Sequence, residues 1–238
     1  MIALPTVFEI SGRMAMFRKP YTTTSSISYP FPPPSALAGM IAAILGYTHG
    51  AEDKGWNALY WEKMKGTQVA LRIMNPVSWH SETINFWNVK EPQKNPHIQV
   101  KHQFLREPRY RVFVKGPLEE ELDSFLSKGC FLYTPYLGVA YALCDVKYLG
   151  RFKEEGCIPP VKVNTVIPFE DGLKVDVLGS GGVFRELVPF SMDEERTLKK
   201  SITVLFQLSP DKGIAIEEKG DVEIARCGED VVAWFPSW

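Results

Sequence analysis

The sequence predicts an α+β fold, in which a ferredoxin-like domain over residues 1–152 carries an inserted β-hairpin arm at about residues 75–105. A smaller, mostly β domain follows over residues 153–238. Three observations predict this arrangement. Strand and helix patterns alternate in the order β-α-β-β-α-β, a polar and proline-broken stretch interrupts them, and turn signals recur after residue 151. The 238 residues, 45% hydrophobic and 23% charged, are typical of a soluble globular protein.

The first strand is predicted over residues 5–19, where apolar and polar side chains alternate. One face of this strand would carry Phe8, Ile10, Met14 and Met16. Pro20 ends the strand, because proline has no amide hydrogen for ladder pairing. Residues 21–34 are predicted to form an ordered loop, in which a run of Thr and Ser precedes a cluster of prolines.

A helix is predicted over residues 35–47, with Pro34 suited to its first position. Its apolar side chains recur at helical spacing and comprise Leu37, Met40, Ile41, Ile44 and Leu45. A second helix is predicted over residues 55–65, and a strand over residues 67–73. Gly39 and neighbouring alanines would let the first helix lie close to a sheet.

The next part of the chain is predicted to leave the sheet and return to it. Residues 75–96 are polar, aromatic and broken by prolines, which indicates an elaborated hairpin or arm. Strands are predicted over residues 98–105 and 110–114, a helix over 117–128 and a closing strand over 139–149. Acidic residues in the first turn of that helix and a glycine directly after it support its bounds. The resulting order is that of ferredoxin-like and RRM-like domains.

Charge is unevenly distributed along the chain, although the net charge is only −1. Residues 1–152 carry 17 Lys and Arg against 12 Asp and Glu, whereas residues 153–238 carry 10 against 16. The densest basic stretch, residues 86–115, holds seven Lys and Arg. This asymmetry favours a first half that faces a polyanion and a second half that does not.

Several classes of protein are disfavoured by the sequence. The longest apolar run, residues 36–45, is about half the length that a bilayer requires, and no secretory signal is visible, so a cytoplasmic protein with no membrane partner is expected. The four cysteines are far apart and include no C-x-x-C pair, so buried, reduced thiols are expected instead of disulfides or zinc. No metal ligand set and no cofactor site are predicted.

Two groups of residues are candidates for binding nucleic acid. The first lies at the end of the first strand and comprises Arg13, Arg18, Lys19, Tyr21 and Thr22 with the following Thr and Ser residues. Cations beside an aromatic ring and hydroxyl groups suit contacts to phosphate, sugar and a stacked base. The alternative interpretation is a solvated strand end followed by a polar loop.

The second group lies in and after the arm. It comprises Lys90, Lys94, Lys101, His102, Arg106, Arg109, Arg111 and Lys115, interleaved with Phe86, Trp87, Phe104 and Tyr110. Cations neutralise phosphates and aromatic faces stack on bases, which is the combination that single-stranded nucleic acid requires. An amphipathic hairpin with its charges in water is the equally weighted alternative.

Catalysis is a minority interpretation. Tyr21 or Tyr47 together with Lys101 and His102 could form a general acid-base set for cleaving RNA through its 2′-hydroxyl. Adjacent residues on a strand point to opposite faces, however, which separates Lys101 from His102. The glycine-rich residues 179–182 lack the following Lys and Ser or Thr of a phosphate-binding loop and are predicted to form a turn.

Residues 12–46 resemble the N-terminal signature of the CRISPR-associated family five proteins, with weaker similarity at residues 104–114 and 135–138. The resemblance implies a ferredoxin-like domain with a protruding thumb at the arm, and a role in binding the 5′ handle of the guide RNA inside a Cascade effector complex. It also implies contacts to a family-seven backbone subunit and the large subunit, with a family-six nuclease nearby. Arg13, Arg18 and Lys19 match the family's strand-end cations.

One subtype in this family cleaves precursor RNA with a Tyr, a Lys and a His, and Lys101-His102 resembles that pair. The opening block is more similar to the non-cleaving subtypes. We therefore expect a non-catalytic RNA-binding subunit, with a metal-independent endoribonuclease as the alternative. The expected RNA-binding residues are Arg13, Arg18, Lys19, Tyr21, Thr22, Lys90, Lys101, Arg106, Arg109 and Arg111.

Overall fold

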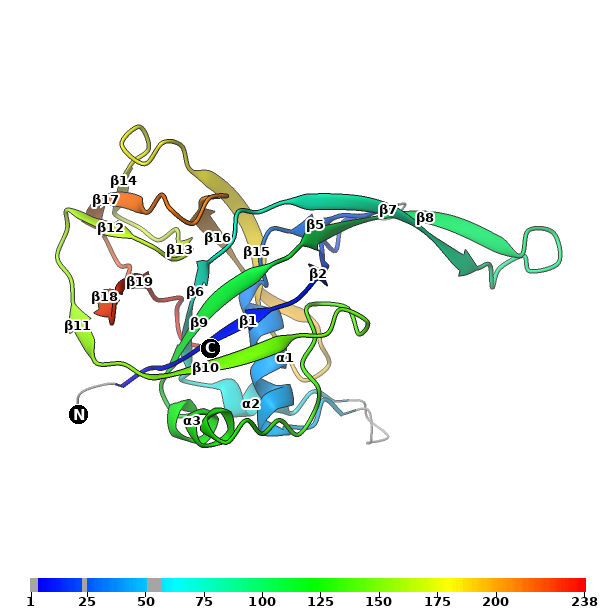
Figure 1. The fold of residues 1–238 in the computed structure, drawn as a ribbon, viewed down its shortest axis with the longest axis horizontal. Coiled ribbons are helices and arrows are strands. Elements are labelled where there is room, and N and C mark those ends of the chain that lie inside the picture. Colours follow the sequence, from blue (N-terminus) through cyan, green and yellow to red (C-terminus); the bar gives the residue numbers. More distant parts are fainter. Residues whose placement is uncertain (1–3, 23–24, 51–56) are drawn as a thin grey trace.

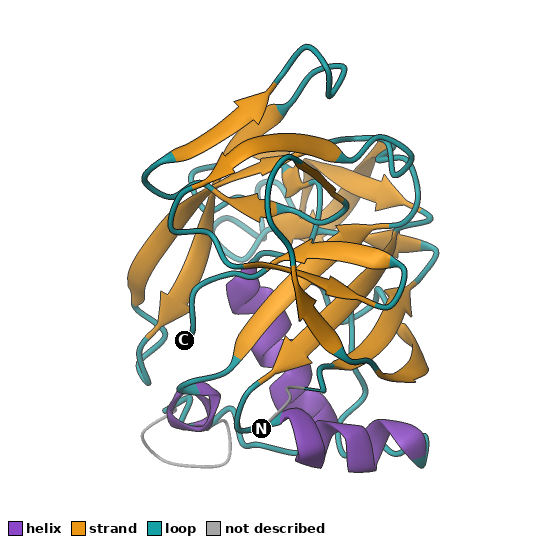
Figure 2. Ribbon diagram, turned by 90° about the vertical axis from the view of Figure 1, so that its left-hand side faces the viewer, coloured by secondary structure: helices purple, strands orange, loops and turns teal. Residues whose placement is uncertain are grey.

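The computed structural model describes residues 4–22, 25–50 and 57–238. Strands predominate in these residues, and the helices among them are α1 (Pro34–Leu45), α2 (Tyr60–Met64) and α3 (Glu119–Ser127). Figure 2 shows the helices gathered in the lower part of the molecule, beneath and beside the strands. The predicted α+β class is confirmed.

The central sheet is antiparallel and has the strand order β10-β1-β9-β6. Its strands are β1 (Thr6–Ser11), β6 (Gln68–Ile73), β9 (Arg109–Lys115) and β10 (Asp145–Arg151). Along the chain α1 lies between β1 and β6, and α3 lies between β9 and β10 (Figure 1). Phe8 and Ile10 of β1 pack in one core cluster with Leu37, Ile41 and Ile44 of α1.

Helix α1 begins at the predicted proline and ends at Leu45, two residues before the predicted bound. Pro34 occupies the first turn, where a missing amide hydrogen costs nothing. Gly46 ends the helix with a φ of 76°, a conformation that glycine adopts without strain. A side chain at this position would also collide with Leu132. The chain is therefore turned sharply at the end of α1 and leads away from the sheet.

The predicted arm is a long antiparallel hairpin of β7 (Trp79–Trp87) and β8 (His97–Arg106). It projects from the body of the molecule (Figure 1). At the base of the arm, β8 pairs antiparallel with β2 (Met14–Ala15). It also pairs with β4 (Ser25–Ser26), which runs parallel to it. Two short segments from the N-terminal part of the chain therefore anchor the arm.

The C-terminal half is mostly β, as predicted, and forms three small sheets with the orders β11-β18-β19, β12-β17-β14 and β13-β16-β15. Its strands are β11 (Glu154–Gly156), β12 (Val161–Val163), β13 (Ile167–Pro168), β14 (Leu173–Asp176), β15 (Phe184–Met192), β16 (Leu198–Phe206), β17 (Ile214–Lys219), β18 (Ile224–Cys227) and β19 (Asp230–Ala233).

The hydrophobic core crosses residue 152. The ring of Phe31, directly before α1, meets that of Phe206 on β16 edge to face with centroids 5.1 Å apart. On the opposite face of the central sheet, Val7 and Phe113 pack with Val232 and Trp234 from the end of the chain. The division into domains at residue 152 stays a prediction. The second half has one core cluster of its own, around Val163, Ile214 and Ile224, but the two clusters that contain buried residues of the first half also contain residues of the second.

The prediction of one strand over residues 5–19 is wrong, because the chain bends after β1 and continues as β2 and β3 (Phe17–Arg18). Strand β3 pairs with β5 (Ser28–Tyr29). The bend occurs at Gly12, whose amide donates to the Pro108 carbonyl and where a Cβ would meet the Leu143 carbonyl. The bend changes the alternation, so that Met14 is exposed and Ala15 is buried.

Three other predictions need correction. Residues 139–144 form a turn closed by a hydrogen bond from the Ala142 amide to the Val139 carbonyl, and the strand expected at 139–149 begins at β10. The helix expected over 55–65 is the shorter α2, and residues 55 and 56 lie outside the described residues. All four cysteines are free, but only Cys227 is buried, and Cys130 is exposed.

No helix within the described ranges combines the length and the apolar character needed to cross a bilayer. In residues 4–22, 25–50 and 57–238, no three His, Cys, Asp or Glu side chains are arranged to hold a metal ion.

Candidate nucleic-acid interface

The base of the arm brings the two candidate groups of residues together. Met14, beside Arg13, pairs with Arg106 at the end of β8. Ser25 of the Thr and Ser run pairs with Lys101 on the same strand. Strand β8 therefore lies beside both the first strand end and the hydroxyl-rich loop. Thr23 and Thr24 of that run lie outside the described residues.

Two arginines line a pocket at this base. The pocket has a volume of about 190 Å³, and Arg13, Arg106, Phe104 and the pair formed by His80 and Glu82 lie around it. Arg13 and Arg106 are both exposed. Two guanidinium groups beside an aromatic ring can bind a phosphate by charge-assisted hydrogen bonds while a base stacks nearby.

The strand-end cations lie in different environments. Arg18 is exposed, and its guanidinium donates to the Thr22 carbonyl at 2.9 Å. Tyr21 exposes 67% of its surface, as a stacking platform requires. Lys19, in contrast, forms an ion pair with Glu186 of β15 at 2.5 Å and lies 5.1 Å from the centroid of the Tyr29 ring. Burial alone would lower the pKa of Lys19, but the hydrogen bond and the charge of Glu186 raise it overall.

The outer arm has two different faces, because pairing places alternate residues on opposite sides. One face carries the polar side chains of Ser81, Thr83, Asn85, Gln99, Lys101 and Gln103, followed at its outer end by the exposed Trp87 and its partner His97. The other face carries Ile84, Phe86, Ile98, Val100, His102 and Phe104 together with His80 and Glu82. Lys101 is exposed on the polar face, and Lys90 is exposed near the tip.

His102 has the environment of a packed core residue. Only 6% of its surface is exposed, and its ring lies between those of Phe86 and Phe104, with centroids 5.5 and 5.9 Å away. Its Nδ1 lies 3.1 Å from the Val100 carbonyl, to which it donates. Lys101 and His102 thus point to opposite faces, as the alternation predicted.

The tyrosine candidates do not complete a catalytic set with His102. Tyr47 lies beyond the end of α1, where its hydroxyl donates to Glu121 of α3, and burial together with that carboxylate raises the pKa of Tyr47. Tyr21 lies on the exposed loop before β4. No hydrogen bond among the described residues joins either tyrosine to Lys101 or His102. In this geometry His102 is buried and Lys101 lies on the opposite face of the strand, so the candidates are not gathered into one set.

Arg109 and Arg111 differ in how available they are. Both bind Glu9, and Arg111 also binds Glu229 and Asp230 at 2.7 Å. Arg111 is 14% exposed and sits between the central sheet and the turn joining β18 to β19. Because the charge of Arg111 is already neutralised by three carboxylates, we remove Arg111 from the expected RNA-binding set. The sequence had no signal for these partners, which lie about 100 residues or more away. Arg109 is exposed and lines a small pocket together with Arg106, so it stays in that set.

The central sheet itself is not open to nucleic acid in the manner of an RRM. RRM domains stack bases on aromatic residues of the sheet face that the helices leave free. Here β18 and β19 cover that face, with Trp234 packed against Phe113 and Val7. Contacts to RNA are therefore left to the arm and the strand ends.

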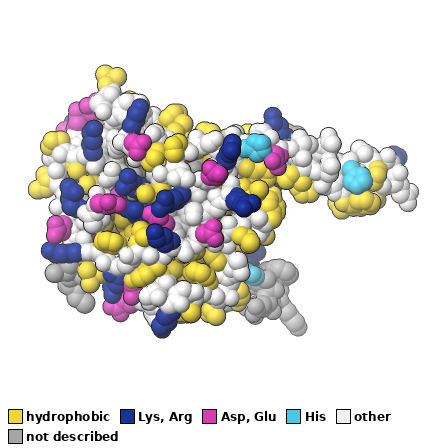
Figure 3. Space-filling model, viewed as in Figure 1, with side chains coloured by type: hydrophobic (Ala, Val, Ile, Leu, Met, Phe, Trp, Pro, Cys, Tyr) yellow, Lys and Arg dark blue, Asp and Glu magenta, His cyan; other side chains and the backbone are white. Residues whose placement is uncertain are grey.

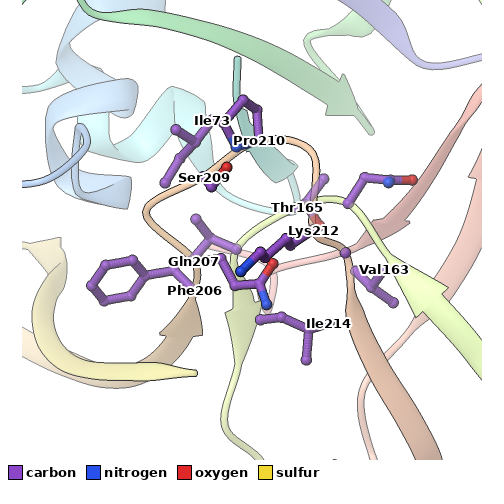
Figure 4. Close-up of a pocket in the computed structure, with 12 residues that line it drawn as sticks. Ile73, Val163, Thr165, Phe206, Gln207, Ser209, Pro210, Lys212 and Ile214 are labelled. Atoms are coloured by element: carbon purple, nitrogen blue, oxygen red, sulfur yellow. The ribbon is translucent and has the colours of Figure 1, made fainter. Parts of the chain in front are cut away.

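The charges on the face of the body that Figure 3 shows are mixed in sign. Figure 3 shows Lys and Arg interspersed with Asp and Glu over the body of the molecule on this face. A pocket lined by residues such as Ile73, Gln207 and Lys212 (Figure 4) has a volume of only about 20 Å³, room for about one water molecule.

Comparison with known proteins identifies the family. The family model described as CRISPR-associated protein (Cas_Cas5) matches residues 6–140, which is more than half of the chain. The chain belongs to the CRISPR-associated Cas5 family. The match spans the N-terminal strands, α1, the arm and α3, and so includes the interface described above. Comparison with curated proteins finds no match.

Solved structures resemble this Cas5 chain in fold. A CRISPR protein from Archaeoglobus fulgidus is 16% identical with a TM-score of 0.58, over 97% of this chain and 98% of that chain. A chain of a CRISPR RNA-guided surveillance complex is 17% identical with a TM-score of 0.52, over 90% and 91%. A chain of the type III-B Cmr-beta complex bound to cognate target RNA is 12% identical with a TM-score of 0.51, over 88% and 86%.

Proposed function

We propose that this Cas5 family member is a non-catalytic subunit of a CRISPR effector complex that binds the 5′ handle of the guide RNA. The observation that carries the proposal is the pocket at the base of the arm that Arg13 and Arg106 line together. These two arginines come from separate segments of the sequence and supply charge at one place, while Ser25 pairs with Lys101 further along β8, where Lys101 lies on the opposite face of the arm. The first half would act as a ferredoxin-like RNA-binding domain, with the arm as its thumb.

The proposed contacts follow from exposure. Phosphate contacts come from the exposed cations Arg13, Arg18, Lys90, Lys101, Arg106 and Arg109, with Thr22 as an additional polar contact. Tyr21 provides a ring for stacking. Lys19 joins this set only when Glu186 releases it. The apolar face of the arm can pack against displaced bases or a neighbouring subunit.

The proposed partners come from the family resemblance. They are the family-seven backbone subunit, the large subunit and a family-six nuclease in the cytoplasm of the host. The likeness in fold to chains of a surveillance complex and of Cmr-beta supports such an assembly. The near-neutral net charge of this chain suits a subunit that shares the neutralisation of one RNA with its neighbours.

The first test measures RNA binding and its salt dependence. A fluorescent RNA with the handle sequence of the host's own repeat is titrated with the wild type, with Arg13→Ala/Arg106→Ala and with Arg226→Ala, which removes an exposed cation on β18. Each lost phosphate contact should reduce the slope of log K against log salt by about 0.7, so the double variant should lose about 1.4. The β18 variant should match the wild type, and an equal loss in both would contradict the proposed interface.

The second test addresses the endoribonuclease alternative. Precursor repeat RNA is incubated with the wild type and with His102→Ala in the presence of a chelator. We expect no defined cut with either protein, because the buried ring of His102 has no access to a 2′-hydroxyl. A defined cut that is abolished by His102→Ala would show that the protein is an endoribonuclease and would contradict the non-catalytic proposal.

A further inference from the structure

Residues 129–144 form a surface without charge. This stretch contains no Asp, Glu, Lys, Arg or His, although it lies between the helix α3 and the strand β10 on the outside of the molecule. Six of its large apolar side chains are exposed, namely Phe131, Leu132, Tyr133, Tyr136, Tyr141 and Leu143, while Leu137 is buried in the core. We call these six residues the neutral surface. Exposed apolar residues scattered singly are ordinary, but six within one short segment indicate an interaction site.

The backbone of the neutral surface is held in place. The amides of Leu132 and Tyr133 donate to the carbonyls of Ile44 and Ala43 at the end of α1. Further along, the Met16 amide donates to the Leu137 carbonyl, and the Cys144 amide donates to the Pro135 carbonyl. The segment is thus fastened at both ends to regular structure. A surface that is already ordered loses little conformational entropy when a partner binds.

A groove of about 600 Å³ adjoins this surface, within the range typical of ligand sites. One wall is the outer face of α1, where Ala36, Gly39 and Ala43 leave space. The opposite wall contains Tyr133 and Tyr136. Tyr47, Tyr60 and Arg196 also line the groove, and the guanidinium of Arg196 is occupied by the His49 carbonyl. The groove therefore combines a small-residue floor with ring faces and hydroxyl groups.

The chemistry of the neutral surface favours a protein over RNA. A polyanion is held by cations, and the neutral surface itself has none. Tyrosine, phenylalanine and leucine without lysine or glutamate are the composition of the buried centre of a protein interface. Tyrosine hydroxyls in the groove can also bond to the main chain of a partner. On the neutral surface itself, a segment with charged side chains would leave them without counter-ions, and in the groove the Arg196 guanidinium already donates to the His49 carbonyl.

We propose that the neutral surface and its groove are the docking site for an uncharged, apolar segment of another protein, which inserts one large apolar side chain between Gly39 and Tyr133. The proposal rests on the proposed function, because that protein is expected to be another subunit of the same effector complex. It adds a location and a chemistry for the contact, on side chains other than the cations that hold the RNA, although the ring of Tyr141 meets that of Phe104 at the edge of the RNA pocket.

The main experiment places a charge on the neutral surface. Leu143→Asp changes a residue that is 64% exposed, and the matched control Leu178→Asp changes a leucine that is 93% exposed on the distant turn after β14. Each variant is co-expressed with the remaining subunits of the host's complex and its guide RNA, and the amount of each subunit retained is quantified. Leu143→Asp should lose at least one subunit by about tenfold or more, as expected when a charge is buried without a partner. Leu178→Asp should retain all of them.

RNA binding separates this inference from the proposed function. Both leucine variants should still bind the handle RNA, because neither side chain is among the proposed RNA contacts, and only Leu143→Asp, which lies beside Gly12, adds a negative charge near Arg13. Normal subunit retention by Leu143→Asp, or equal loss in the two variants, overturns the docking site while leaving RNA binding in place. Absence of handle binding in the wild type, with subunit retention still sensitive to Leu143→Asp, overturns the RNA function alone.

A second pair of variants tests the groove. A Cβ at Gly39 would meet only the Tyr60 hydroxyl at 3.7 Å, so the fold accepts a larger residue there. Gly39→Ala should raise the thermal midpoint, because alanine is the better helix former, and should leave association nearly unchanged. Gly39→Leu should keep the fold, measured by circular dichroism, and reduce subunit retention by filling the groove. A folded Gly39→Leu variant that assembles normally contradicts the inserted side chain.

Photo-crosslinking identifies the occupant directly. A photoreactive amino acid replaces Leu143 in the assembled complex, with the same replacement at Leu178 as the control. The expected product is a link to an uncharged, apolar segment of another subunit, read by mass spectrometry of the crosslinked peptide. A link to RNA or to a second copy of this chain overturns the proposal, and so does a link to a charged segment.

Discussion

Lys19 illustrates how a cation acquires its role from a residue distant in sequence. As part of the run Arg18-Lys19-Pro20 it is predicted to contact RNA, yet Glu186 holds it in an ion pair within a partly buried site. A phosphate that binds Lys19 must first displace this carboxylate. The ion pair therefore opposes RNA binding at this position. It could be predicted only once β15 was known to lie beside the end of the first strand.

Glu186→Gln should strengthen RNA binding by freeing Lys19 for a phosphate. One additional contact should increase the slope of log K against log salt by about 0.7. Fluorescence anisotropy across a salt series measures both quantities. The control is Glu218→Gln, which breaks an exposed pair with Lys174 in the C-terminal half and should leave RNA binding as it was. Unchanged binding by Glu186→Gln would show that Lys19 does not meet the RNA.

Glu9 is a buried carboxylate whose partners are Arg109 and Arg111. Burial alone would raise the pKa of Glu9, but the hydrogen bonds and charges of the two arginines lower it overall, below 4.5. A carboxyl whose pKa is lower in the folded state stabilises the fold fully above its unfolded pKa. That contribution is lost as the pH falls through the folded value.

Glu9→Gln should therefore reduce the free energy of unfolding at pH 7 by about 1.5–3 kcal/mol, the range for hydrogen bonds to charged groups. The difference from the wild type should shrink below pH 4.5, where protonation weakens the same pairs in the wild type. Urea unfolding at pH 7 and at pH 3 measures this. A difference that stays constant between the two pH values would mean that the carboxylate charge is not what stabilises the site.

At the scale of elements, the position of the arm could be predicted from the local sequence, whereas the strands that pair with its base could not. Its position was predicted from a polar, proline-broken stretch, and the strand expected over residues 98–105 is confirmed as β8. Its anchors β2 and β4 are two residues long and have no periodicity of their own. Their pairing with β8 depends on a bend at Gly12 and a loop return, so sequence alone could not reveal that the two candidate groups meet.

Shortening the arm should affect RNA binding and leave the core intact. Residues 86–98 are replaced by Asn-Gly, which joins the paired residues Asn85 and Gln99 through a two-residue turn. The removed residues are exposed, apart from the partly exposed Asn88, so the thermal midpoint should change by no more than about 4 °C, equivalent to less than about 1 kcal/mol. Handle affinity should fall, because Lys90 and Lys94 are lost. Full RNA affinity in the shortened protein would exclude the outer arm from the interface.

At the scale of the whole molecule, the two halves of the chain stabilise each other. The face of the central sheet that carries Val7 and Phe113 is covered by the last strands, and Phe31 packs against Phe206. The acidic second half also supplies Glu186, Glu229 and Asp230 to cations of the first half. Part of the opposite charge of the two halves is thus neutralised within the molecule, by ion pairs between them.

A fragment of residues 1–152 should fail to form a cooperatively folded domain. It would expose the apolar sheet face around Phe113, Val7 and the ring of Phe31, all of which are buried in the full chain. We expect weak near-ultraviolet circular dichroism and strong binding of a hydrophobic dye, as in states that lack fixed packing. A fragment with a sharp thermal transition would instead support the predicted boundary at residue 152.

The sequence by itself determined the elements and their chemistry, because helix caps, strand alternation and turn residues act within a few positions of the chain. Helix α1, the arm, α3 and the opposite orientation of Lys101 and His102 follow from such local rules. The tertiary structure alone decided which cations are available. Arg111 and Arg106 are alike in sequence, but one is neutralised by carboxylates more than 100 residues away and the other remains exposed. Long-range pairing depends on how sheets stack, and no local pattern encodes that stacking.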